Sequence, residues 1–378
     1  MAQDAPLSGL KVVELARILA GPWLGQALAD LGAEVVKVEA PQGDDTRTWG
    51  PPFIEREGDR SAAYFHAANR GKRSVTADFR TEAGRQTVRR LAGDADILIE
   101  NFKVGGLAKY GLDYASLAAL NPRLIYCSIT GFGQDGPYAG RAGYDFLIQG
   151  MSGLMSVTGE PDTPPQKVGV AVTDIVTGLY GAVGVLAAVE QRHRTGRGQH
   201  LDMSLLDCAV ALMANQAMNY LATGAAPQRR GNAHPNIVPY QAMPAADGWI
   251  IVAAGNDGQF GRLCAVLGVP ELAADPDYAT NEGRVARREA LMARLEALTR
   301  GWTMADLLAA LEAATVPAGP INDLAAVFAD PQVVARGLQI APEGLPGVRG
   351  PWRFSGAALR LDRAAPPRGD PADGAASE

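Results

Sequence analysis

The first 130 residues alternate apolar, β-rich runs with helical patterns, and this alternation constrains the fold more than any other feature. LKVVEL at 10–15 and EVVKV at 34–38 predict strands, and between them residues 23–31 have the apolar spacing of a helix that ends at Gly32. The pattern then repeats, with helices predicted at 81–91 and 112–120 and strands at 95–100 and 123–129. Continuous apolar strands separated by helices are typical of a parallel sheet covered on both faces. We therefore predict an α/β fold whose large domain is a doubly wound, Rossmann-like parallel sheet.

The position of a binding site follows from this fold class. In open parallel sheets, ligands bind beyond the C-terminal ends of the strands. The loops that follow the predicted strands are rich in polar residues and glycine, and we expect them to surround a site. These loops are 16–22, 39–50, 100–106 and 130–145.

The remaining chain predicts long helices at 175–190 and 201–221, a strand at 249–254 and mostly helix over 260–315. The glycines of the first of these helices lie inside a helical pattern and not in a turn after a strand, so they indicate close helix packing and not a dinucleotide fingerprint. These glycines are Gly178, Gly181 and Gly184.

A change of composition near Ala225 marks the domain boundary. We predict a large domain over 1–228 that is completed by 326–362, and a smaller α/β domain over 229–325. Residues 363–378 are rich in Pro, Ala, Gly and Asp, a composition that predicts a disordered tail.

Composition and charge argue against several classes of protein. The net charge of −6 is the opposite of the basic excess that nucleic-acid binding requires, so no nucleic acid is expected as a partner. Cys127, Cys208 and Cys264 form no CxxC pair, which argues against a disulfide framework and against a metal site. The first residues, MAQDAPLSGL, lack the pattern of a signal peptide, and we see no apolar run of about 18 residues. We therefore expect a cytoplasmic protein with no membrane partner.

Asp174 is the strongest candidate for a residue that takes part in chemistry, and the sequence around it allows two interpretations. The β-rich run 167–172 precedes Thr173 and Asp174, and the predicted helix begins directly after them. A carboxylate in this position can cap the helix by accepting a hydrogen bond from a free backbone N–H. It can equally serve as a nucleophile, because the helix dipole stabilises its charge and a carboxylate can attack a thioester carbonyl. The local pattern does not decide between a cap and a nucleophile.

A series of sequence blocks between about residue 7 and residue 355 points to a known family. They include GLKVVELARILAGP, LGAEVVKVEAPQGDDTR, NRGKRSV, ENFKVGGLAKYGLDY, NPRLIYCSITGFGQDGP, AGYDFLIQG, VAVTDIVTG and RHRTGRGQHLDMSLLD. With these blocks in this order, the chain resembles the class III CoA-transferases, a family that also includes α-methylacyl-CoA racemase. The resemblance implies an interlocked homodimer that uses coenzyme A as a substrate, with no tightly bound cofactor and no metal.

The resemblance also implies roles for individual residues. Asp174 matches the catalytic aspartate of the family, which favours the nucleophile interpretation. One position of the CoA site departs from the transferase pattern, because Ala40 stands where an arginine precedes the proline. The implied CoA contacts are Arg17, Leu19, Ala20, Lys37, Glu39, Ala40, Asn69, Lys72, Arg73, Asn101, Phe102, Lys109 and Tyr144.

Within the family, Tyr144 favours transfer over racemisation. The racemases have a histidine before the aspartate of this segment, and tyrosine is a poor base for exchanging an α-proton. The segments GNAHPNIVPYQAM and AAGNDGQF resemble the branch that moves CoA from succinyl-CoA to small dicarboxylates. An α-methylacyl-CoA racemase and a non-catalytic CoA-binding dimer remain the alternatives.

The smaller domain supplies the implied acceptor and closure residues. Gly255, Asn256, Asp257, Gly258 and Gln259 would form a mobile glycine-rich loop that shields an acyl intermediate from water, although a plain strand-to-helix turn explains them as well. His234 would contact a substrate carboxylate or cap a loop. Arg229 and Arg230 would pair with the distal carboxylate of a diacid or stay solvated.

Overall fold

The computed structural model describes residues 4–56 and 58–369, and these form two compact units. The first unit contains the chain up to Met155, then Lys167–Ala225, and then the chain from Pro331 onward. The second unit contains Ser156–Gln166 and Ala226–Asp330.

The segment Ser156–Gln166 belongs to the second unit, whereas the sequence analysis assigned it to the large domain. Its hydrogen bonds explain the difference. The guanidinium of Arg229 donates to the carbonyl oxygens of Glu160, Pro161 and Thr163, and the backbone N–H of Gly231 donates to Gly159. Arg229 therefore holds this segment in the second unit through hydrogen bonds. Its guanidinium is not free, as it would have to be to bind a substrate carboxylate.

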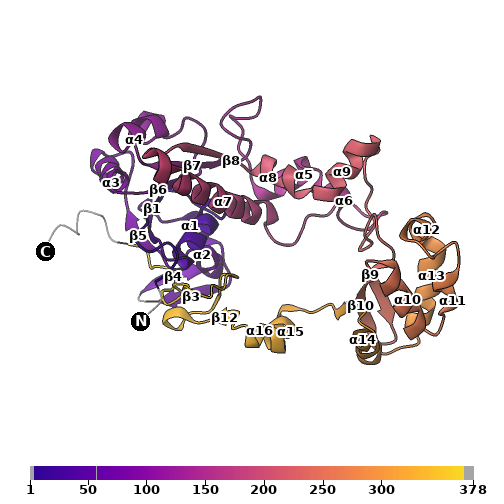
Figure 1. Ribbon diagram of the computed structural model, residues 1–378. Helices are drawn as coiled ribbons and strands as arrows, with labels where there is room; N and C mark the ends of the chain where they lie inside the picture. The colour runs from indigo at the N-terminus through magenta and orange to yellow at the C-terminus, as the bar shows by residue number, and fades with distance from the viewer. Residues whose placement is uncertain (1–3, 57, 370–378) are drawn as a thin grey trace. The chain divides into compact units, whose positions relative to one another are not determined.

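The first unit is built on a six-stranded parallel sheet in the order β5-β2-β1-β6-β7-β8, so chain order reverses at β1 (Figure 1). This is the doubly wound arrangement expected from the sequence. The strands are β1 (Lys11–Glu14), β2 (Glu34–Glu39), β5 (Arg73–Thr76), β6 (Ile97–Glu100), β7 (Ile125–Thr130) and β8 (His200–Ser204).

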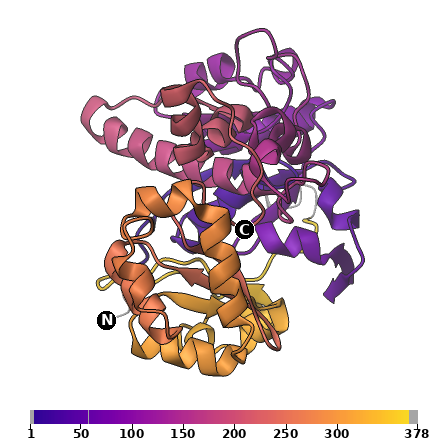
Figure 2. The same ribbon diagram turned by 90° about the vertical axis from the view of Figure 1, so that its right-hand side faces the viewer.

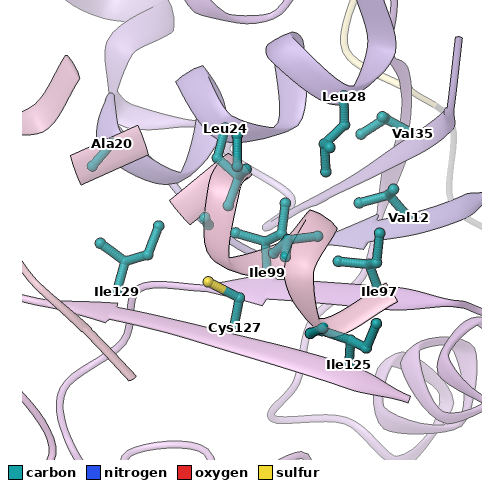
Figure 3. Packing of buried hydrophobic residues seen from close by; sticks show 14 of the residues in the cluster. Val12, Ala20, Leu24, Leu28, Val35, Ile97, Ile99, Ile125, Cys127 and Ile129 are labelled. Carbon is teal, nitrogen blue, oxygen red and sulfur yellow. The ribbon is translucent and has the colours of Figure 1, made fainter. Parts of the chain in front are cut away.

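Helices cover both faces of this sheet, because successive strand residues point to opposite sides. Val12 and Ile97 pack beneath α1 (Ala20–Asp30) and α7 (Val172–Thr195), as Figure 3 shows for the strand residues below Leu24 and Leu28 of α1. Val13 and Leu98 point the other way, toward α3 (Glu82–Gly93) and α4 (Tyr114–Leu120).

The glycines of α7 allow the close helix packing that the sequence predicted. A Cβ on Gly178 would lie 2.8 Å from the carbonyl oxygen of Ala20, and one on Gly181 would lie 3.2 Å from Leu24. A Cβ on Gly184 would lie 2.9 Å from Leu201 of β8. α7 is also long and apolar enough to cross a membrane by length and composition, which the sequence analysis did not anticipate. A core helix passes the same test, and α7 packs against α1 and the sheet.

β5 and β8 were not predicted from the sequence. Residues 201–221 were expected to form one helix, but the structure has β8 there, followed by α8 (Leu205–Leu212) and α9 (Ala214–Thr223). Ser204 ends the strand and caps α8, because its Oγ accepts a hydrogen bond from Asp207 N. β8 is an edge strand and only Ser204 in it is fully buried, so it lacks a continuous apolar pattern.

Four further elements of the first unit lie between β2 and β5 and were also not predicted. They are the 3-10 turn η1 (Asp45–Thr48), the hairpin of β3 (Phe53–Arg56) and β4 (Asp59–Ala62), and α2 (Ala63–Ala68). Later in the chain come η2 (Ala108–Tyr110), α5 (Asp145–Met151) and α6 (Leu154–Val157).

The second unit is a small α/β unit with an antiparallel sheet in the order β11-β10-β9. Its strands are β9 (Tyr240–Ala245), β10 (Gly248–Ala253) and β11 (Ala318–Pro320). Figure 2 shows its helices in orange shades around this sheet. They are α10 (Asp257–Val266), α11 (Glu271–Ala274), α12 (Asn281–Ala286), α13 (Arg288–Thr299) and α14 (Met304–Ala313). The unit also contains α15 (Leu324–Ala329).

The end of the described chain returns to the first unit through α16 (Pro331–Ala335), β12 (Gln339–Ile340), η3 (Pro342–Gly344) and β13 (Gly347–Val348). Residues 363–369 are packed there, so the predicted disorder is wrong for them. Ala364 and Ala365 are buried, and Gly369 N donates to Ser74 Oγ. The rest of the predicted tail, 370–378, lies outside the described residues.

A buried ion cluster connects β1 and β2 with the segment that follows α2. The Glu14 carboxylate accepts from Lys37 Nζ at 3.1 Å and from Lys72 Nζ at 2.8 Å, and Lys37 also contacts Asp44 at 2.9 Å. All four side chains are almost fully buried. Gly25 of α1 provides the room, because a Cβ there would lie 1.8 Å from Glu14 Oε2.

We predict that Gly25→Ala destabilises the first unit by about 3 kcal/mol, because the new methyl group displaces a buried carboxylate from its two lysines. Gly150→Ala in α5 is the control, since its Cβ would meet only Met155 Sδ at 3.7 Å. Denaturant unfolding followed by circular dichroism measures both variants. Equal midpoints for Gly25→Ala and the wild type would contradict the prediction.

Candidate active site

A cavity of about 560 Å³ opens at the C-terminal ends of the parallel strands in the first unit. All four loops expected to surround a site contribute to its wall, and so does Asp174 in the first turn of α7. Nine of the residues named in the sequence analysis line it. They are Arg17, Leu19, Ala20, Ala40, Asn101, Phe102, Lys109, Tyr144 and Asp174.

The cap of α7 is not Asp174. The residues at 167–170 form no strand, and α7 begins at Val172 with no cap from the side chain of Ala171. Instead, the carboxylate of Asp145 in α5 accepts hydrogen bonds from Thr173 N at 2.9 Å and from Thr173 Oγ1 at 2.8 Å. The structure thus contradicts the cap interpretation of Asp174 and leaves its carboxylate free to line the cavity.

The environment of Asp174 shifts its proton affinity. Burial of the carboxyl group, together with the negative charge of Asp145, raises the pKa of Asp174 to about 7. The helix dipole was expected to keep this carboxylate ionised, but burial and the neighbouring charge outweigh the dipole. A group with this pKa is a stronger nucleophile than an ordinary aspartate and is ionised in part at neutral pH.

Tyr64 of α2 lies close enough to this centre to respond to its charges. Its side chain is half-buried and packs edge-on against Trp49 at 5.4 Å between ring centroids. Burial and then the charges of Asp174, Asp145 and Asp44 raise the pKa of its hydroxyl. The sequence analysis did not identify Tyr64, because no local pattern links α2 to α7.

Asn101 holds the first loop of the cavity in place. Its side-chain oxygen accepts from Arg17 N at 2.9 Å, and its Nδ2 donates to Arg17 O at 2.7 Å, in the manner of a paired strand. The next residue, Ile18, has φ of +70°, which is unfavourable for a β-branched side chain. Asn101 therefore fixes the backbone of the first loop while it lines the cavity, and its contact with CoA stays a prediction.

Five of the implied CoA contacts do not line the cavity. Lys37 and Lys72 are buried in the ion cluster with Glu14, and Asn69 accepts from Lys72 Nζ at 2.8 Å. Glu39 is buried and pairs with Arg47 at 2.7 Å. Their side chains have partners inside the unit, and their contact with CoA stays a prediction. Arg73 is exposed at the start of β5 but outside the lining.

The cavity wall also contains an aromatic and cationic cluster that was not anticipated. Phe79 packs against Phe102 at 5.9 Å and against Tyr110 at 6.3 Å, and Lys109 Nζ lies 4.8 Å from the ring of Tyr110. Arg80 belongs to the same wall. Phe79 and Arg80 follow β5, and recognising that strand from the sequence would have pointed to them. Further unanticipated lining residues are Ile18, Gln42, Asp78, Lys103 and Arg141.

In the second unit, the expected glycine-rich loop is a short, ordered turn. Asn256 caps α10 by accepting from Gln259 N at 2.9 Å, and Gly255 N donates to Gln259 Oε1 at 2.7 Å. Asp257, Gly258 and Gln259 already belong to α10. The alternative of a strand-to-helix turn therefore describes this segment.

His234 likewise has internal partners in the second unit. Its Nδ1 accepts from Asn236 N at 3.1 Å, and its ring lies 5.1 Å from that of Tyr240. Burial and the charge of Arg288 lower its pKa. These contacts fit the loop-capping role that the sequence analysis left open.

Comparison with known proteins identifies relatives along almost the whole chain. The family model described as CoA-transferase family III matches residues 7–371. A succinate–glutarate CoA-transferase of Agrobacterium fabrum is 58% identical over 97% of this chain and 93% of that protein. Human succinyl-CoA:glutarate CoA-transferase is 42% identical over 96% of this chain and 83% of its own length. The crystal structure of a CAIB/BAIF family protein from Brucella suis, 65% identical, matches with a TM-score of 0.88 over 97% of each chain.

We predict that Asp145→Asn lowers the pKa of Asp174, because the amide keeps an oxygen that can accept from Thr173 but removes the negative charge. A raised carboxyl pKa means that Asp174 gains its reactive, ionised form as pH rises through about 7. The acidic limb of the pH–rate profile should therefore move to lower pH in the variant. Asp135→Asn, which changes an exposed carboxylate of the 131–144 loop, should leave the limb in place. An unmoved limb in Asp145→Asn would refute the electrostatic coupling.

Proposed function

The chain belongs to CoA-transferase family III, and from this premise we propose that it moves coenzyme A from succinyl-CoA to a small dicarboxylic acid such as glutarate. That the chain is a CoA-transferase rests on the family match and on relatives up to 58% identical. The choice of substrates draws on relatives named for succinyl-CoA, glutarate, mesaconate and D-citramalate. One observation supports this mechanism above all. The carboxylate of Asp174 lines the cavity at the C-terminal ends of the strands, and it does not cap α7, because Asp145 accepts the hydrogen bond from Thr173 N.

The chemistry begins with attack of Asp174 on the thioester carbonyl of the donor. The carbon–sulfur bond breaks, CoA leaves as the thiolate, and Asp174 is left in an anhydride with the acyl group. The thiolate then attacks the aspartyl carbonyl, which releases the donor acid and forms an aspartyl-CoA thioester. The acceptor carboxylate attacks this thioester to form a second anhydride and free thiolate. Attack of the thiolate on the new acyl carbonyl releases the product and restores Asp174.

The composition of the cavity wall supports one orientation of bound CoA, with the nucleotide at one end of the cavity and the thioester at the other. The aromatic and cationic cluster of Phe79, Phe102, Tyr110, Arg80 and Lys109 suits the nucleotide, because aromatic rings stack on adenine and cations pair with phosphates. Asp174 would then receive the thioester at the other end of the ligand. A cavity of about 560 Å³ is of the size that holds such a ligand in extended form.

The racemase alternative has less support. Exchange of an α-proton needs two bases on opposite sides of the substrate carbon. Asp145 is occupied, since its oxygens accept from Thr173 and from Gln149 Nε2 at 2.8 Å. Tyr144, which stands where the racemases have histidine, is exposed at the cavity wall, and a phenol is a poor base for this exchange.

We further propose an interlocked homodimer. Several large apolar side chains of the first unit are exposed along α5, α7 and α9, in a pattern that suits burial against a second chain. They are Phe146 at 59%, Leu147 at 48%, Val183 at 66%, Met218 at 61% and Leu221 at 72%. The open face of the small sheet adds Trp249 at 55% and Ile251 at 41%.

We predict that Asp174→Ala lowers the rate of succinyl-CoA:glutarate exchange by a factor of about 10³ or more, because the substitution removes the carboxylate that forms the anhydride. Chromatography of the CoA esters measures the rate, and mass spectrometry after hydroxylamine trapping locates the intermediate. Asp135→Ala should exchange CoA like the wild type. Full turnover in Asp174→Ala, or a trapped adduct on another residue, would refute the mechanism, and α-proton exchange without transfer would favour the racemase.

We predict that the double variant Val183→Asp, Leu221→Asp weakens self-association, because two charges would be buried at the proposed contact. Leu120→Asp is the control, since Leu120 is 53% exposed at the end of α4, outside α5, α7 and α9. Sedimentation equilibrium measures the association constant. A monomeric wild type, or a double variant that associates as strongly as the wild type, would contradict the homodimer or its contact surface.

A further inference from the structure

Arg141 differs from the other arginines of the cavity wall. Arg17 is paired with Asp45 at 3.1 Å and Arg80 with Asp78 at 2.8 Å. Within residues 4–56 and 58–369, no carboxylate lies within ion-pair distance of Arg141. Its guanidinium carbon instead lies 3.9 Å from the centre of the Tyr138 ring. Arg141 is thus an exposed cation that is held by an aromatic face and has all its hydrogen-bond donors to offer a ligand.

The chain around Arg141 leads directly to the nucleophile. Its backbone N–H donates to Tyr138 O at 2.8 Å, and two residues later Gly143 packs against Gly131 so closely that a Cβ would lie 2.4 Å from the Gly131 Cα. The segment then reaches Asp145, which binds Thr173 beside Asp174. The Arg141 segment is therefore anchored to the first turn of α7, whereas Arg80 and Lys109 belong to the aromatic cluster on the loops after β5 and β6.

We propose that Arg141 binds the distal carboxylate of the acyl group and so selects dicarboxylic over monocarboxylic substrates, an inference that rests on the proposed transferase function. A planar guanidinium binds a carboxylate through two parallel hydrogen bonds. The reacting carboxyl group of a diacid meets Asp174, and the second carboxylate needs a cation at a distance of a few carbon atoms.

The same residue can serve both halves of the reaction. Succinyl and glutaryl groups differ by one methylene, and the three-methylene stem of an arginine adjusts to such a difference. A monocarboxylic acyl group would leave the guanidinium of Arg141 without its partner. Monocarboxylic acyl groups would therefore bind more weakly because they lack the charge-assisted hydrogen bonds to Arg141. The loss of such an interaction lowers affinity more than the loss of a methylene group does.

The test is equilibrium binding to Asp174→Asn protein, in which no anhydride forms. Glutaryl-CoA is compared with pentanoyl-CoA, which has the same acyl chain length and a methyl group in place of the distal carboxylate. We expect Asp174→Asn protein to bind glutaryl-CoA about 10- to 100-fold more tightly, and this ratio to fall toward 1 when Arg141→Gln is added. Arg141→Lys should retain part of it. Arg80→Gln is the matched control and should weaken both ligands equally, because it changes only the nucleotide end.

Each other outcome is informative. Equal weakening of both ligands by Arg141→Gln would assign Arg141 to the CoA phosphates and overturn the proposal, as would an unchanged ratio. If Asp174→Asn protein binds neither ester, the proposed function itself fails. If that protein binds both esters with equal affinity, the transferase assignment stands and the role of Arg141 falls. In turnover assays of otherwise wild-type protein, Arg141→Gln should raise the KM for glutarate and leave the KM for pentanoate unchanged.

Discussion

Asp145 accepts two hydrogen bonds from Thr173, and the geometry of the cavity depends on this contact between α5 and the start of α7. A helix N-terminus needs an acceptor, and in most helices the residue at the cap position supplies it. Here the acceptor comes from 28 residues earlier in the chain. This leaves the carboxylate in the first turn unbonded, and it places a second negative charge beside it. One side chain therefore satisfies the helix and makes its neighbour more basic.

The cluster of Glu14, Lys37, Lys72 and Asp44 contributes to the site in a different way. Charges in the interior are costly unless their partners are placed well, so each member constrains the others. Asp44 also accepts from Thr46 N at 3.0 Å and from Thr46 Oγ1 at 2.8 Å, which ties the loop after β2 to the strands. Two lysines that resemble phosphate ligands in the sequence thus serve as internal supports, and the cations left for a ligand lie on the loops.

The alternation of strands and helices was sufficient to predict the large sheet, its two covered faces and the edge that carries the cavity. It placed Arg17 and Phe102 in one wall although they are far apart in the chain, whereas Asp174 was assigned to the site only by the family resemblance. It could not show that Lys37 and Lys72 are buried, because a lysine in a short strand or loop has no local mark of burial. Likewise, β5 and β8 were missed because edge strands carry polar residues on their open sides.

The contact between Gly131 and Gly143 has a consequence for how the sequence of the cavity wall can evolve. The two backbones cross at a separation that leaves no room for a side chain on either. Once one position has gained a methyl group and the segments have parted, a second methyl group opposite costs little more. Substitutions at the two positions are thus expected to be strongly non-additive, and a lineage that accepts one can accept the other freely. Such a step would also shift the loop that carries Arg141, although the residue at position 141 stays the same.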